Sequence, residues 1–118
     1  MVQVGIRTLN THQVEQANKF QVEIHDIKNL DLAKTPEFKN PLYISLDMDA
    51  FDPAFAPGVS HHEPGGLSSR QVIELIQGLD AEIIGADIVE YNPDRDFQNM
   101  TAFLAAKIMK EILVKMIQ

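Results

Sequence analysis

The 118-residue sequence contains no cysteine, which excludes a disulfide framework and thiolate chemistry. Basic residues are also scarce: 10 lysines and arginines stand against 17 aspartates and glutamates, for a net charge of −7. This balance, without any basic run, argues against a nucleic-acid partner. No apolar run approaches the ~20 residues of a membrane-spanning helix, and the first ten residues lack the apolar core of a signal peptide. We therefore expect a cytoplasmic protein without a membrane or nucleic-acid partner.

A chain of this length forms one domain at most, and its hydrophobic content of 45% is ordinary for a globular protein. Residues 1–118 show no repeats, linkers or low-complexity segments. The apolar pattern predicts four strands and three helices: strands at 2–6, 22–27, 42–47 and 83–89, and helices at 12–20, 68–78 and 101–117. This order predicts an α/β fold with a mostly parallel sheet covered by helices.

Three local patterns add detail to this outline. Val14, Ala17 and Phe20 recur at helical spacing, so we expect them on the inner face of the first helix. The near-continuous apolar run at 42–46 predicts a strand that is buried on both faces. The polar stretch 29–41 predicts a connection with a short helix in part of it.

The most informative stretch runs from Leu42 to Gly58 and reads LYISLDMDAFDPAFAPG. An apolar strand breaks abruptly into Asp47, Asp49 and Asp52, followed by prolines that cannot continue a central strand. If the chain stays extended, Asp47 and Asp49 point to the same face. Two adjacent carboxylates repel each other, and a cation between them removes that cost. Oxygen ligands of this kind suit magnesium, calcium or manganese.

Other interpretations of these carboxylates fit less well. Aspartate and proline after a strand are common turn formers, so Asp52 and its proline alone indicate little. An EF-hand loop starting at Asp47 would need glycine where Asp52 stands and glutamate where Gly58 stands. A phosphatase of the haloacid dehalogenase kind wants threonine or valine where Phe51 stands.

The extended pattern resembles the ureohydrolases, the family of arginase, agmatinase and formiminoglutamase. The resemblance is carried by SLDMDAFDP at 45–53, by its continuation AFAPGVSHHEPGGLS at 54–68, by GADIVEYNP at 85–93 and by MTA at 100–102. The continuation is most like plant-type arginases and bacterial agmatinase-like enzymes. The resemblance covers nearly the whole chain and is strongest from 42 to 107.

The resemblance implies a three-layer α/β/α fold of about twice this length, with residues 1–118 as the C-terminal portion of a single arginase-like domain. It also implies two Mn(II) ions and hydrolysis of a guanidino C–N bond, which gives urea and an amine. By the motif match, Asp47 and Asp49 are metal ligands, and Glu90 pairs with the substrate guanidinium. His61 lies in a loop that faces the substrate. Asp52 and Asp87 are expected to brace the loop or support the metal ligands.

The other family ligands have no match in this chain. No Asp-Ala-His-x-Asp type of segment is present, and His12 and His25 stand in no such context, so we interpret them as structural or surface residues. No residue is assigned as certainly catalytic. We therefore expect only a partial metal site and an isolated chain that is inactive. The alternative is a non-catalytic fragment that associates with itself, and a homo-oligomer is expected in either case. Arginine and agmatine remain equally open as substrates.

Overall fold

The protein is described by a computed structural model covering residues 1–31 and 38–117. The chain divides into two compact units, Met1–Asp31 and Leu32–Gln118. All seven predicted strands and helices are present within the described residues, and both strand pairs are parallel, as predicted. The pairs form two separate two-stranded sheets, one in each unit. Part of the predicted 29–41 connection, residues 32–37, lies outside the described residues.

The first unit is a β-α-β arrangement in which β1 (Val2–Ile6) pairs in parallel with β2 (Glu23–Asp26). The helix α1 (Thr11–Lys19) connects them, and a capping box between Asn10 and Gln13 satisfies the first free N–H groups of the helix. The predicted inner face of this helix was wrong. Val14 is 43% exposed and Phe20 is 66% exposed, and α1 has no buried residue among those described.

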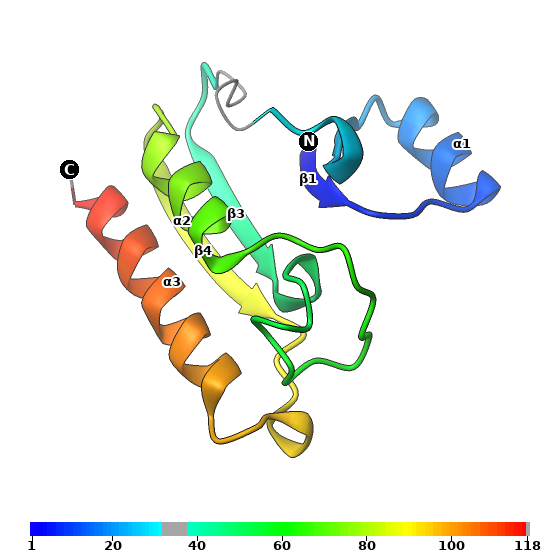
Figure 1. Ribbon diagram of the computed structural model, residues 1–118. Helices are drawn as coiled ribbons and strands as arrows, with labels where there is room; N and C mark the ends of the chain where they lie inside the picture. Colours follow the sequence, from blue (N-terminus) through cyan, green and yellow to red (C-terminus); the bar gives the residue numbers. More distant parts are fainter. Residues whose placement is uncertain (32–37, 118) are drawn as a thin grey trace. The chain divides into compact units, whose positions relative to one another are not determined.

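The second unit pairs β3 (Leu42–Asp47) in parallel with β4 (Ile83–Val89). The helix α2 (Ser69–Gly78) joins them, and α3 (Met100–Met116) follows β4. Figure 1 shows α2 and α3 running along this strand pair, and α3 contacts both α2 and β4. A capping box begins α2: Oγ of Ser68 accepts the backbone N–H of Gln71, and the backbone N–H of Ser68 donates to Oε1 of Gln71.

Burial along β3 alternates between half-buried and exposed residues, so the prediction of burial on both faces was wrong. Tyr43 is 61% exposed, and Ser45 and Asp47 on the same face are exposed as well. The alternation shows that the packed side chains of this unit cover only one face of the strand. The face that carries Asp47 is therefore open.

A long loop, residues 48–68, supplies much of the core of the second unit. Its buried side chains are Met48, Phe51, Ala56, Val59 and Leu67, each at most 2% exposed. A single bridge between Phe51 and Leu67 closes the base of the loop. The loop is thus a packed element, which is how long functional loops hold a fixed shape.

Within the described residues, no helix is long and apolar enough to cross a bilayer.

Candidate functional site

The parallel register places the acidic ends of β3 and β4 side by side. Asp47, the last residue of β3, pairs with Val89, the last residue of β4. Glu90 is the next residue after Val89, so it lies at the same end of the strand pair as Asp47. Glu90 has φ 63°, a left-handed conformation that costs a non-glycine residue free energy. Such conformations concentrate at functional sites. The carboxyl ends of parallel strands are also where α/β proteins bind ligands.

Asp47 and Asp49 are held by a tight local turn. The strand stops at Asp47, whose Oδ1 accepts the backbone N–H of Asp49 at 2.8 Å and caps the short 3-10 helix Met48–Ala50. The prediction that Asp49 extends the face of the strand was therefore wrong, because the chain is helical at that residue. The turn still keeps both carboxylates next to the strand end, two residues apart.

The same turn recurs after other strands. Asp26 caps the 3-10 helix Ile27–Asn29 after β2, and Asn92 caps the 3-10 helix Pro93–Arg95 after β4. In each case a side-chain oxygen accepts the N–H two residues on. Asp47 therefore has a structural role as a cap in addition to any ligand role.

His61 is brought to Asp49 by the long loop. Its Nδ1 lies 3.5 Å from Oδ2 of Asp49, while the imidazole side chain is 82% exposed and the Asp49 side chain is 18% exposed. The Oδ1 atom of Asp49 is buried. The loop thus places an imidazole at the edge of the carboxylate pair, where it faces solvent.

Asp52 organises the backbone of the loop. Its Oδ1 accepts the N–H of Ala54 at 2.9 Å, and its Oδ2 accepts the N–H groups of Gly65 at 2.7 Å and Gly66 at 3.2 Å. These bonds join the two arms of the loop over 13 and 14 residues. Hydrogen bonds to a carboxylate are among the stronger ones in proteins, so Asp52 fixes the shape of the loop.

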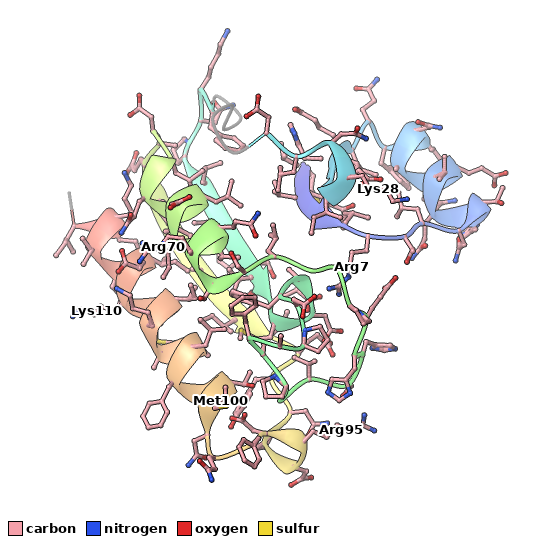
Figure 2. The ribbon with its side chains drawn as sticks, viewed as in Figure 1. Arg7, Lys28, Arg70, Arg95, Met100 and Lys110 are labelled. Carbon is pink, nitrogen blue, oxygen red and sulfur yellow. The ribbon has the colours of Figure 1, made fainter. Side chains whose placement is uncertain are left out.

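The other side of the loop is tied to the segment after β4. The backbone N–H of Asn92 donates to the carbonyl of Gly58 at 2.8 Å, and its side-chain amide donates to Oγ of Ser60 at 3.1 Å. Arg95, which is labelled in Figure 2, donates from Nη1 to the Ser60 carbonyl at 3.3 Å. These bonds connect the segment that follows Glu90 to the loop that follows Asp49.

Asp87 lies within β4, opposite Ser45 in the register. Its Oδ1 accepts the hydroxyl of Ser45 at 2.6 Å, and its Oδ2 accepts the hydroxyl of Tyr43 at 2.9 Å. The hydrogen bond to Asp87 raises the pKa of Tyr43 above its usual value, with burial and the negative charge adding to the effect. Asp87 therefore crosslinks the side chains of the two strands on the face that carries Asp47.

Asp96 anchors the start of α3. It accepts the N–H groups of Thr101 at 2.9 Å and Ala102 at 3.0 Å, and the hydroxyl of Tyr91 at 3.2 Å. Burial raises the pKa of Asp96, but the backbone N–H groups of Thr101 and Ala102 outweigh it and hold the pKa below its usual range. The anionic form also suits the positive end of the helix.

Comparison with known proteins identifies the family of this chain. A model of the Arginase family matches residues 1–115. The chain belongs to the arginase family. It is 44% identical over 124 residues to a mitochondrial arginase of Medicago truncatula, with 98% of this chain and 37% of that protein covered. It is also 34% identical to a guanidino acid hydrolase of Homo sapiens, with 96% and 36% covered.

Solved structures of the arginase family share the fold. An arginase from Medicago truncatula has a TM-score of 0.90 at 43% identity, with 98% of this chain and 39% of that chain covered. A mutant of an arginase-like protein of T. brucei, solved with Mn2+ bound, has a TM-score of 0.90 at 30% identity, with 99% and 42% covered. The predicted fold class and the family resemblance are therefore confirmed. The chain spans somewhat more than a third of its curated relatives.

Four residues shape this site through contacts that the sequence did not predict: Tyr43, Ser45, Asp96 and Gly58. The partners of Asp87 were not predicted, although Tyr43 lies two residues before Ser45 on the same strand face. Asp96 was not singled out, although its position just before the last helix is typical of a capping acid. No close approach of other side chains was predicted at Gly58. A Cβ at Gly58 would lie 2.8 Å from Cβ of Asp96.

Proposed function

We propose that this chain is the part of a manganese-dependent ureohydrolase that supplies two metal-binding carboxylates and the carboxylate that recognises the guanidinium. The observation that carries the proposal is the register of β3 and β4, which brings Asp47 and Glu90 to one end of a parallel strand pair. Family membership supports the reaction class. The relatives include arginases and a guanidino acid hydrolase, so the substrate class is a guanidino compound.

The donor set fits a hard divalent ion in part. Asp47 and Asp49 offer carboxylate oxygens two residues apart at a strand end, which is chemistry that suits manganese. Among residues 1–31 and 38–117, no group of three or more histidine, cysteine or acidic side chains is placed to hold a metal. Asp47 and Asp49 would therefore hold an ion only together with ligands from elsewhere. The two ions of the family site would, when bound, supply a water whose pKa is lowered toward neutrality.

The remaining residues of the site bind and position. Glu90 can accept a bidentate pair of hydrogen bonds from a planar guanidinium, which orients the carbon that is attacked. His61 stands beside Asp49 and can contact the substrate from the loop. Asp52 holds the two arms of the loop together, and Asp87 holds β3 to β4. Both would keep the ligand carboxylates in place without touching the substrate.

The isolated chain is expected to be inactive. Two carboxylates cannot fix two ions in a defined geometry, because Mn(II) prefers about six ligands. Groups that act as a unit in catalysis are not additive, so losing even part of the ligand set is enough to remove most of the activity. A cytoplasmic location stays a prediction. Arginine, agmatine and guanidino acids all belong to the proposed substrate class.

A non-catalytic, self-associating fragment is the second candidate function. The observation that favours it is the number of large apolar side chains left exposed on α3, including Phe103 at 72% and Leu113 at 53%. Exposed apolar patches of this kind mark interaction surfaces. Homo-oligomer formation belongs to both proposals.

The test combines metal binding with turnover. Mn2+ binding to the chain is measured from the loss of the free-ion electron paramagnetic resonance signal, and urea release from arginine and agmatine is assayed in the same samples. We expect weak binding that Asp47→Asn and Asp49→Asn abolish, and no urea. Asp94→Asn is the matched control, because Asp94 is an exposed acid in another 3-10 helix. Equal binding by all variants would contradict the metal assignment.

A further inference from the structure

Asn92 joins the segment after β4 to the long loop with both its backbone and its side chain. Its backbone N–H donates to the carbonyl of Gly58 at 2.8 Å, and its Nδ2 donates to Oγ of Ser60 at 3.1 Å. Its Oδ1 accepts the N–H of Asp94 at 3.1 Å, which orients the side chain. A carboxamide suits this position because it donates and accepts hydrogen bonds at the same time. Asn92 therefore has a defined place against the loop.

The part of the loop that meets Asn92 is itself fixed. Gly58 is buried, and its N–H donates to Oγ1 of Thr101 at 2.7 Å. The two peptide groups around Gly58 are thus bonded to α3 on one side and to Asn92 on the other. Its neighbours Ala56 and Val59 are 0% exposed. Because a buried peptide group that loses its partner is costly, the loop offers Asn92 a stable anchor.

This anchor lies between the two residues that are proposed to contact the substrate. Asn92 follows Glu90 by two residues, and Ser60 immediately precedes His61. Nδ1 of His61 in turn lies 3.5 Å from Oδ2 of Asp49. The hydrogen bond from Asn92 to Ser60 spans 32 residues of sequence and so connects the segment of Glu90 to the segment of His61.

The backbone of Glu90 requires a support of this kind. Its φ of 63° is unfavourable for a residue with a Cβ, and such a conformation persists only where the surrounding structure enforces it. Relaxation to a negative φ would change the direction in which the chain leaves β4 and would move the Glu90 carboxylate. The anchor at Asn92, two residues further on, opposes that relaxation.

We propose that Asn92 is a positioning residue that holds the backbone of Glu90 and sets the Glu90 carboxylate relative to His61. The inference rests on the proposed function, because it requires Glu90 to meet the substrate guanidinium. Asn92 acts through Glu90 and has no assigned contact with the substrate or a metal. Arg95 reinforces the link, because its Nη1 donates to the carbonyl of Ser60 at 3.3 Å.

The first experiment tests the link in the 118-residue chain by amide hydrogen exchange, followed by NMR. Ser60→Ala removes the acceptor of the side-chain bond and leaves the Gly58 carbonyl in place. We expect the Asn92 amide hydrogen to exchange about threefold faster or more, because exchange follows local opening. Ser69→Ala is the matched control, because Ser69 is the first residue of α2 and lies outside the link. Equal exchange at Asn92 in both variants would overturn the proposal.

The second experiment measures turnover of arginine with manganese in a chimera in which residues 1–118 replace the matching segment of the Medicago truncatula arginase. Asn92→Ala should lower kcat/KM about 10- to 100-fold, because misplacing a group that orients the substrate is costly. Asp94→Ala is the matched control, because it removes a side chain from the same segment and keeps the N–H that bonds to Asn92. An unchanged kcat/KM in Asn92→Ala would overturn the proposal.

A double-mutant cycle in the chimera separates positioning from a general loss of stability. If Asn92 acts through Glu90, Asn92→Ala should lower kcat/KM much less in a Glu90→Gln background than in the parent. Equal fold-changes in the two backgrounds, with Glu90→Gln itself impaired, would overturn this inference and leave the proposed function standing. Full turnover by Glu90→Gln would overturn both. If Asn92→Ala fails to fold, Ser60→Ala, which keeps the backbone bond, is taken through the same cycle.

Discussion

Asp47 at the end of β3 is the parallel register partner of Val89 at the end of β4. This pairing determines that Glu90, one residue further, leaves the sheet beside the Asp47 and Asp49 turn. The carboxylates that the motif match assigns to the metal and to the guanidinium therefore come from neighbouring strand ends. The loop that follows each strand is then fastened to the other through Asn92 and Gly58.

Asp52→Ala is expected to destabilise the loop. The substitution removes one carboxylate that accepts the N–H groups of Ala54, Gly65 and Gly66. Losing hydrogen bonds to a charged group should lower the free energy of unfolding by about 2 kcal/mol. Urea denaturation measures the change, with Asp94→Ala as the control for removing an exposed acid. A loss no larger than that of the control would contradict the role of Asp52 as a brace.

Gly58→Ala is expected to be destabilising because no space exists for a methyl group. A Cβ there would lie 2.8 Å from Cβ of Asp96 and 2.9 Å from Oγ1 of Thr101. Overpacking of this kind should cost about 1–3 kcal/mol. Gly65→Ala is a useful companion, because nothing lies within 4 Å of its Cβ and its cost comes from φ 86° alone. Thermal unfolding of both variants gives the comparison, and an unchanged melting temperature for Gly58→Ala would refute the close approach.

Asp96 should make stability dependent on acid pH. Its pKa is lowered in the folded chain by the N–H groups of Thr101 and Ala102, so its contribution is complete above the usual aspartate pKa. The contribution is lost as pH falls from that value through the lowered folded value. Asp96→Asn should therefore be less stable than the parent near pH 6, with the difference shrinking toward pH 2.5. A difference that does not change with pH would contradict this account.

The strands and helices of this chain could be predicted because they depend on local sequence pattern. The apolar runs at 42–46 and 83–89 predicted β3 and β4 correctly. The exposure of α1 and of one face of β3 could not be predicted. Burial depends on what packs against an element, and the sequence pattern shows only which side chains are apolar. Phe20 continues the helical spacing of Val14 and Ala17 and is nevertheless 66% exposed.

The contacts of the site were less predictable than its residues. Asp47, Asp49 and Glu90 follow from the motif, but the turn at Asp49 depends on a side-chain cap that competes with the extended strand. The hydrogen bonds from Tyr43 and Ser45 to Asp87 join residues more than 40 positions apart. Only the register of two strands determines which side chains meet at that separation.

The central claim is that Asp47, Asp49 and Glu90 form the strand-end part of a ureohydrolase site. Its most direct test is urea release by a chimera in which residues 1–118 replace the matching segment of the Medicago truncatula arginase, assayed on arginine with manganese. We expect turnover that Asp47→Ala and Glu90→Gln each reduce by roughly two orders of magnitude or more, while Asp94→Ala leaves it unchanged. A folded, active chimera whose rate is unaffected by Asp47→Ala and Glu90→Gln would contradict the claim.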